Sequence, residues 1–215
     1  MKRTVDSPWI QTGTKITNLL ILNACFTLGC LPVFTIGASL TATFDVAMKI
    51  AQEREDVSII RSFIRAYRVN FKRGMWMGLV LGLVGWCVWL DGQIAFQIGN
   101  APIAAWVVFV LGLLLLYVHA LYAFALEARY ENTWFMAFIN SRKIATRFFV
   151  PTLGLSAALT AEVFLFWGTA PFLTYCGLFC APVCLVYTIC KTLLPILRTL
   201  DRDAKASDGF SVNGR

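Results

Sequence analysis

Two long stretches without a fixed charge constrain this chain more than any other feature. Residues 163–190 contain no Asp, Glu, Lys or Arg, and residues 92–126 are uncharged unless His119 is protonated. A helix needs about 20 apolar residues to cross about 30 Å of hydrocarbon. Only 14% of the 215 residues are charged, against about 25% in soluble domains. The sequence therefore predicts an all-α integral membrane protein without a sizeable soluble domain.

Hydropathy divides the chain into apolar stretches at residues 16–34, 38–50, 74–96, 103–125, 149–169 and 172–197. The first two are separated by a break at Pro32 and Gly37. The second stretch is short for a full crossing, so five crossings result if it only extends the first. The predicted fold is a polytopic helix bundle of three helical hairpins, with five or six crossings.

The basic residues favour six crossings. Cytoplasmic flanks of membrane helices concentrate Lys and Arg. With six crossings all 19 Lys and Arg fall on one side, and the turns at residues 32–37, 91–102 and 169–172 contain none. Both termini are then cytoplasmic. Residues 1–200 form one membrane domain, and the polar residues 201–215 are predicted to be a disordered cytoplasmic tail.

The two basic connections are predicted to be amphipathic helices. In residues 57–72, apolar and basic residues recur with helical spacing, so a helix there has one apolar face and one cationic face. This pattern is typical of a helix lying at a membrane surface. The apolar face contains Ile60, Phe63, Ile64, Tyr67 and Phe71, and the cationic face contains Arg61, Arg65, Arg68 and Lys72. Those four cations are candidates for contact with anionic lipid or a partner protein. Residues 132–147 repeat the pattern less cleanly, either as a weak internal repeat or by chance.

Small residues indicate close helix packing at the start of the third stretch. Gly74, Gly78 and Gly82 recur at every fourth position, which leaves one helix face without side chains. Such a face lets another helix approach closely in lipid. The seven cysteines all lie in apolar stretches, where they suit helix contacts. No metal site is predicted for these cysteines. For Cys30 and Cys176, a disulfide is an alternative to two free thiols.

Part of the chain resembles a known family. The residues that carry the resemblance are Asn18-Leu19-Leu20, residues 31–37 (LPVFTIG), Thr41-Ala42, Lys49, Phe63, Tyr67 and Asn70-Phe71-Lys72, with weaker similarity at residues 122–130. They resemble the YesL-like family of bacterial integral membrane proteins. The chain departs from the family pattern at Ala38, Asp45 and Glu127.

The resemblance implies a multi-pass protein of the bacterial cell membrane with no defined biochemical activity. Members of the family are often encoded beside sugar ABC importers and glycan-degrading enzymes, which implies a role in carbohydrate uptake. The resemblance supplies no catalytic residues.

Ionisable or polar residues inside apolar stretches are candidates for a functional site. They are Glu162, His119, Asn23 and Asp45. Glu162 lies near the middle of its stretch, where it is either a proton or cation site or a neutral acid bonded to a neighbouring helix. His119 is either a functional group or a structural residue within bonding reach of Asn18 and Asn23. Asp45 precedes Lys49 by four residues, so a local ion pair also explains it.

Two functions from different classes follow from these features. The first is a non-enzymatic accessory or regulatory protein of carbohydrate uptake, which contacts membrane lipids and sugar ABC importer subunits. The second is a small secondary transporter that uses Glu162 and His119. The sequence contains no recognisable catalytic or phosphate-binding motif, so we expect no enzyme activity and no cofactor. Membrane topology accounts for the net charge of +7, so we expect no nucleic-acid partner.

Overall fold

A computed structural model describes residues 8–52, 58–97, 102–130, 134–167 and 171–206, and all regular secondary structure there is helical. The side chains are described for these residues except 8–11, 134–135, 162–163, 165–167, 171–181 and 200–206. The elements are α1 (Pro8–Gly29), the short 3-10 helix η1 (Val33–Thr35), α2 (Ile36–Ala51), α3 (Ile59–Gln97), α4 (Ile103–Arg129), α5 (Trp134–Arg147), α6 (Phe149–Trp167) and α7 (Pro171–Ala206). The predicted all-α class is confirmed.

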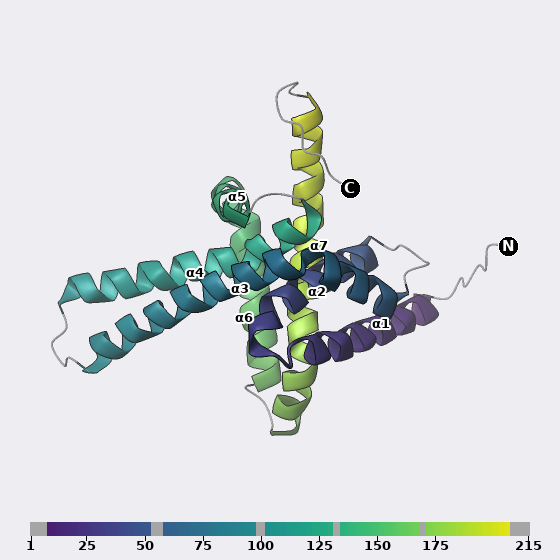
Figure 1. Cartoon of the computed structure of the whole chain (residues 1–215), viewed down its shortest axis with the longest axis horizontal. Helices are drawn as coiled ribbons and strands as arrows, with labels where there is room; N and C mark the ends of the chain where they lie inside the picture. Colours follow the sequence, from purple (N-terminus) through teal and green to yellow (C-terminus); the bar gives the residue numbers. More distant parts are fainter. Residues whose placement is uncertain (1–7, 53–57, 98–101, 131–133, 168–170, 207–215) are drawn as a thin grey trace.

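Helix α2 forms the centre of the structure. It packs against α1, α3, α4 and α7, and Figure 1 shows it where the other helices meet. Its side chains Phe44 and Val46 are almost fully buried, as are Leu22 of α1, Met77 of α3 and Leu193 of α7. The core therefore lies around the shortest of the apolar stretches.

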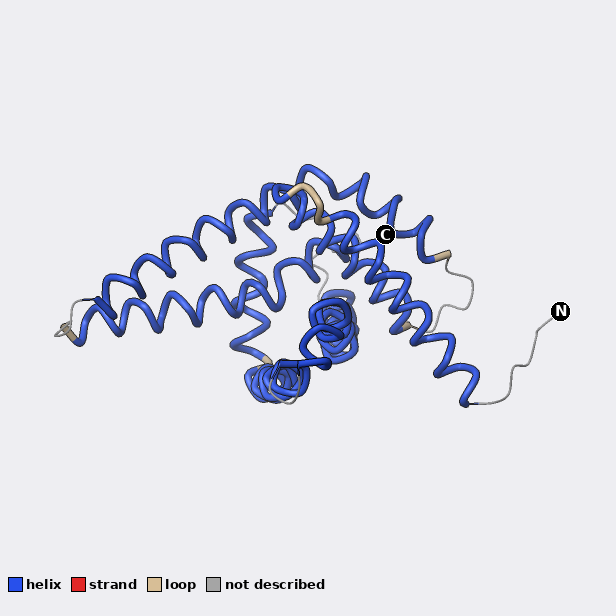
Figure 2. Tube along the Cα trace, turned by 90° about the horizontal axis from the view of Figure 1, so that it is seen from below, coloured by secondary structure: helices blue, strands red, loops and turns tan. Residues whose placement is uncertain are grey.

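The helices pair as hairpins, but the hairpins do not run parallel. Consecutive helices contact each other in the pairs α1–α2, α3–α4 and α6–α7. The α3–α4 pair extends to one side in Figure 1, while α6 and α7 run across it. Figure 2 shows the α6–α7 pair nearly end-on with the α3–α4 pair lying across the view. These two hairpins therefore cross near α2.

Fewer candidate membrane spans are found than the six crossings that the basic residues favour. Within the described residues, four helical segments are long and apolar enough to cross a membrane: Val33–Ala51, Ile59–Gln97, Ile103–Arg129 and Pro182–Thr199. A fifth results if the bent pair Met136–Arg147 and Phe149–Ala161 counts as one span. The stretch at residues 16–34 is not among them. Its helix ends at Gly29 and includes Lys15, Asn18 and Asn23, which lower its hydropathy.

The first predicted connecting helix is not a separate element. Helix α3 runs without a break through 39 residues, which corresponds to about 58 Å at 1.5 Å per residue. That is about twice the hydrocarbon thickness. No proline interrupts the segment, and Gly74 is buried against α2 rather than ending the helix. The prediction that residues 57–72 form a separate connecting helix is therefore wrong, because this helix continues into the apolar stretch.

The second connection does form a distinct helix. The segment Met136–Arg147 of α5 meets Phe149–Ala161 of α6 at 98°. Pro151 lies in the first turn of α6, where its missing N–H costs nothing, but its ring would clash with the carbonyl of residue 147 in a continuous helix. Pro151 thus explains why α5 turns away from α6 while the corresponding residues in α3 continue straight.

The chain end is also more helical than predicted. Helix α7 continues to Ala206, so residues 201–206 are not the start of a disordered tail. Residues 207–215 lie outside the described part of the chain.

Candidate functional site

The first turns of α3 carry a row of exposed basic side chains. We call Arg61, Arg65, Arg68, Lys72 and Arg73 the cationic segment, and each is exposed. Among the described residues, no ion pair within 4.0 Å joins an acidic side chain to the cationic segment, whereas Asp45 and Lys49 of α2 form one. A row of unpaired cations on one helix attracts anionic groups.

The predicted apolar face of this segment is only partly covered. Phe63 is 6% exposed and packs its ring against Tyr67 at 6.0 Å between centroids. In contrast, Ile60 is 56% exposed and Ile64 is 45% exposed. The buried face holds α3 to the core, while the exposed apolar side chains lie beside the basic ones. The segment thus offers both apolar and cationic contacts to whatever covers it.

Glycines bring α3 into backbone contact with α2. A Cβ atom added to Gly78 would lie 2.7 Å from Cα of Gly37, and one added to Gly74 would lie 2.8 Å from Cα of Ala38. Such distances leave no room for a side chain. The third predicted glycine does not take part, because a Cβ on Gly82 would meet nothing within 4 Å. The packing face is therefore formed by Gly74 and Gly78 with Gly37, and Gly82 lies beyond the end of α2.

Buried hydroxyl groups of η1 and α2 donate hydrogen bonds to backbone carbonyl oxygens, a feature that the sequence did not predict. Thr35 Oγ1 donates to the carbonyl oxygens of Gly29 at 2.8 Å and Pro32 at 2.7 Å, and so closes the turn between α1 and α2. Ser39 Oγ donates to the Phe26 carbonyl at 3.0 Å and ties α2 to α1. The signal was the run of Ser and Thr in an apolar stretch, because buried hydroxyls need such partners.

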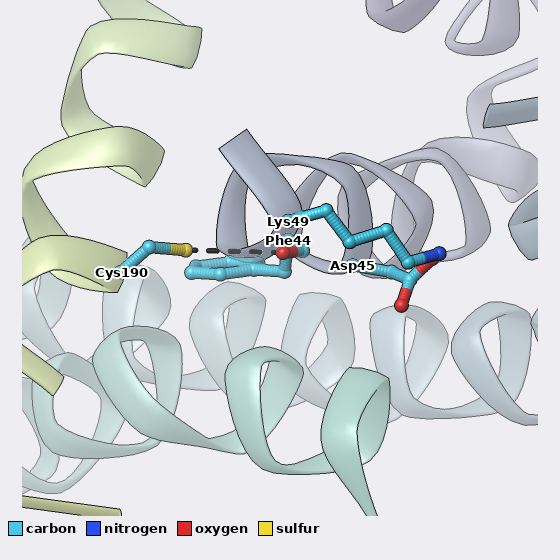
Figure 3. A network of polar contacts seen from close by, with 4 residues as sticks. All are labelled: Phe44, Asp45, Lys49 and Cys190. Atoms are coloured by element: carbon cyan, nitrogen blue, oxygen red, sulfur yellow. Dashed lines mark hydrogen bonds and ion pairs between the residues drawn. The ribbon is translucent and has the colours of Figure 1, made fainter. Parts of the chain in front are cut away.

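Asp45 is explained by its neighbour. Its Oδ2 lies 2.6 Å from Nζ of Lys49, one turn along α2. Figure 3 shows this pair, together with Cys190 of α7 pointing toward the backbone of α2. The Cys190 Sγ lies 3.8 Å from the carbonyl oxygen of Phe44. The local ion pair was one of the two interpretations of Asp45, and the structure confirms that one.

The other polar candidates are not joined into one site. His119 Nδ1 lies 2.6 Å from the Leu115 carbonyl oxygen of its own helix, and its ring lies 5.2 Å from that of Phe138. Asn23 is 8% exposed, and its Oδ1 has no hydrogen-bond partner. No hydrogen bond or ion pair connects His119, Asn23 and Asp45 within the described residues. Glu162 lies in α6, but its side chain is outside the described part of the chain.

A buried acid lies instead near the C-terminal end of α4. Glu127 is 3% exposed, and neither carboxylate oxygen has a hydrogen-bond partner. The sequence signal was a single Glu next to a long apolar stretch. Among the described residues, no group of three His, Cys, Asp or Glu could hold a metal ion. Cys30 has a free thiol, and Cys176 lies where side chains are not described.

A family model matches one part of the chain. Residues 16–91 match the family described as "Protein of unknown function, DUF624". The match contains α2, the cationic segment and the glycines that pack α2 against α3. The weaker similarity at residues 122–130 lies outside it. No curated protein and no solved structure matches the chain.

Proposed function

We propose a non-enzymatic accessory role in bacterial carbohydrate uptake, because residues 16–91 match the model of the DUF624 family and the chain is a multi-pass membrane protein. In this role the cationic segment binds a membrane subunit of a sugar ABC importer at the cytoplasmic side. The observation that supports the proposal is the exposed row of cations on α3, which lies inside the family match. The carbohydrate connection rests on the resemblance to YesL-like proteins.

The length of α3 supports a role in contact rather than in anchoring. The helix measures about 58 Å, while the hydrocarbon layer is about 30 Å thick. The apolar part of α3 and the other candidate spans already hold the chain in the membrane. Each cation near an anionic surface contributes about 1 kcal/mol. That energy is therefore available to orient α3 on a partner instead of anchoring it.

The polar residues lend less support to a transporter. A sugar path needs several convergent hydrogen-bonding groups. His119 bonds the backbone of its own helix, and Asp45 pairs with Lys49. His119 and Asp45 therefore do not form a shared polar site. The transporter alternative then depends on Glu162 alone.

The proposal is tested by removing charge from the cationic segment. We expect the triple variant Arg61→Gln, Arg65→Gln, Arg68→Gln to insert and fold normally, since all three side chains are exposed. It should lose at least about tenfold in affinity for the importer subunits, because three contacts of about 1 kcal/mol each are removed. Co-purification from native membranes and sugar uptake by cells measure the loss.

A matched control removes exposed cations elsewhere. Arg142 and Lys143 are exposed on α5, and Arg142→Gln with Lys143→Gln should leave co-purification and uptake unchanged. If the triple variant keeps its partners and its uptake phenotype, the accessory proposal fails at this site. If both variants lose only binding to anionic vesicles, the segment contacts lipid and not a protein.

Orientation in the membrane is a further part of the proposal. With both termini cytoplasmic, single cysteines at Asn100 and Ala170 should react with a membrane-impermeant thiol reagent from outside in a cysteine-free background. Cysteines at Thr12 and Asp208 should react only after the membrane is opened. Labelling of Thr12 from outside would place the N-terminus outside, as an odd number of crossings requires with a cytoplasmic C-terminus.

A further inference from the structure

The buried carboxylate of Glu127 lacks the donors that such a group requires. It lies at the end of a continuous buried run, residues 121–127, and both of its oxygens are without a hydrogen-bond partner. Leaving a buried charged or polar group unpaired is costly. A donor that reaches Glu127 would remove this cost.

The register of the α3–α4 hairpin identifies that donor. The two helices are antiparallel neighbours, and a Cβ on Gly112 of α4 would lie 2.9 Å from Val88 of α3. A Cβ on Gly92 of α3 would lie 2.7 Å from the ring of Phe109 of α4. Both contacts give nearly the same register. Moving along the two helices in opposite directions therefore predicts which residues face each other farther along the hairpin.

This register brings Arg73 to the level of Glu127. Fifteen residues before Val88 on α3 is Arg73 (88 − 15), and fifteen residues after Gly112 on α4 is Glu127 (112 + 15). Arg73 is also the charged residue that interacts electrostatically with the Glu127 carboxylate. Its side chain is exposed in this structure and makes no ion pair with Glu127 within 4.0 Å, as judged from the described residues.

We propose that Arg73 and Glu127 form an ion pair between α3 and α4 in a second conformation, in which the Arg73 side chain turns from the surface onto the buried carboxylate. A guanidinium presents its N–H donors in a planar fork that can satisfy both oxygens of a carboxylate at once. Closing the pair removes one cation from the end of the cationic segment. An anionic group that holds Arg73 at the surface keeps the pair open. The ion pair does not depend on whether the cationic segment binds an importer subunit.

Charge reversal in the full-length protein tests the pair. Arg73→Glu places a second carboxylate at the buried one, so it should lower the thermal midpoint in detergent by about 5 °C or more relative to the wild type. Arg68→Glu reverses a charge five residues away on the same helix, and we expect it to change the midpoint by less than about 2 °C. Adding Glu127→Arg to Arg73→Glu should recover at least half of the loss, and adding it to Arg68→Glu should not.

A neutral background keeps the test decisive if Glu127→Arg does not fold. In Glu127→Gln, the effects of Arg73→Glu and Arg68→Glu should become equal, because the buried charge is gone. The difference in the wild-type background should also persist at about 1 M salt, where the Debye length is about 3 Å. Equal effects of the two reversals in the wild-type background overturn the ion pair. Loss of the difference in high salt also overturns it, because only an exposed long-range field then acts on Glu127.

Discussion

Replacing Gly78 with leucine is expected to lower the thermal midpoint of the protein in detergent by roughly 6–12 °C. A Cβ at this position would lie 2.7 Å from Cα of Gly37 and 3.0 Å from its backbone nitrogen. Both atoms belong to the backbone of α2, so no side-chain rotation relieves the clash. Overpacking costs about 3 kcal/mol at such sites, and each kcal/mol corresponds to about 2–4 °C in a chain of this size.

The matched control is Gly82→Leu on the same helix. A Cβ at Gly82 meets nothing within 4 Å, so leucine is accommodated and improves helix propensity by up to about 1 kcal/mol. We expect no loss of thermal stability. Size-exclusion chromatography after heating measures both variants in the same detergent. Equal midpoints for Gly78→Leu and Gly82→Leu would contradict the α2–α3 contact.

The difference between Gly78 and Gly82 marks the limit of prediction from sequence here. Spacing by four residues places all three glycines on one face of α3. How far that face is covered depends on where α2 begins and at what level it meets α3, which is a property of two helices and not of one. In the sequence, Gly37 was interpreted as part of the break between the first two apolar stretches. In the structure it lies within α2, where it contacts Gly78.

Local signals predicted the elements well. The uncharged stretch at residues 103–125 lies within α4 (Ile103–Arg129), and the stretch at residues 149–169 nearly coincides with α6 (Phe149–Trp167). Hydropathy and chain breakers such as Pro32 act within a few residues, so they are visible in sequence. Amphipathic periodicity is different: it predicted the helix that the structure shows from Ile59 onward, but it could not show that this helix continues into the span.

The candidate site was less predictable than the fold. Of the polar candidates, Asp45 followed from its spacing to Lys49, because a salt bridge four residues apart is local. Glu127 lies at the end of an apolar stretch, so the sequence did not mark it as a candidate site residue. Its burial depends on α4 being surrounded by neighbouring helices at residues 121–127, which only the tertiary structure shows.

Tyr122 connects α4 to α6, and its truncation should have the second large effect on stability. The side chain is 1% exposed, and its hydroxyl lies 2.8 Å from Thr152 Oγ1. The Thr152 hydroxyl already donates to the Phe148 carbonyl at 2.8 Å. The Tyr122 hydroxyl therefore acts as the donor and Thr152 as the acceptor. This hydrogen bond joins the two helices beside the bend at Pro151.

Tyr122→Ala removes both the ring and this bond, and we expect it to lower the free energy of unfolding by about 3 kcal/mol, mainly through the cavity it leaves. Tyr122→Phe keeps the ring and removes only the donor, so it should cost about 1 kcal/mol. Tyr117→Ala is the control on the same helix, because Tyr117 is 39% exposed, and it should change stability by less than about 0.5 kcal/mol. Thermal midpoints in one detergent rank the three variants. A Tyr122→Ala variant as stable as Tyr117→Ala would show that α4 does not pack on α6 through this side chain, and the placement of the α6–α7 hairpin against the core would then be wrong.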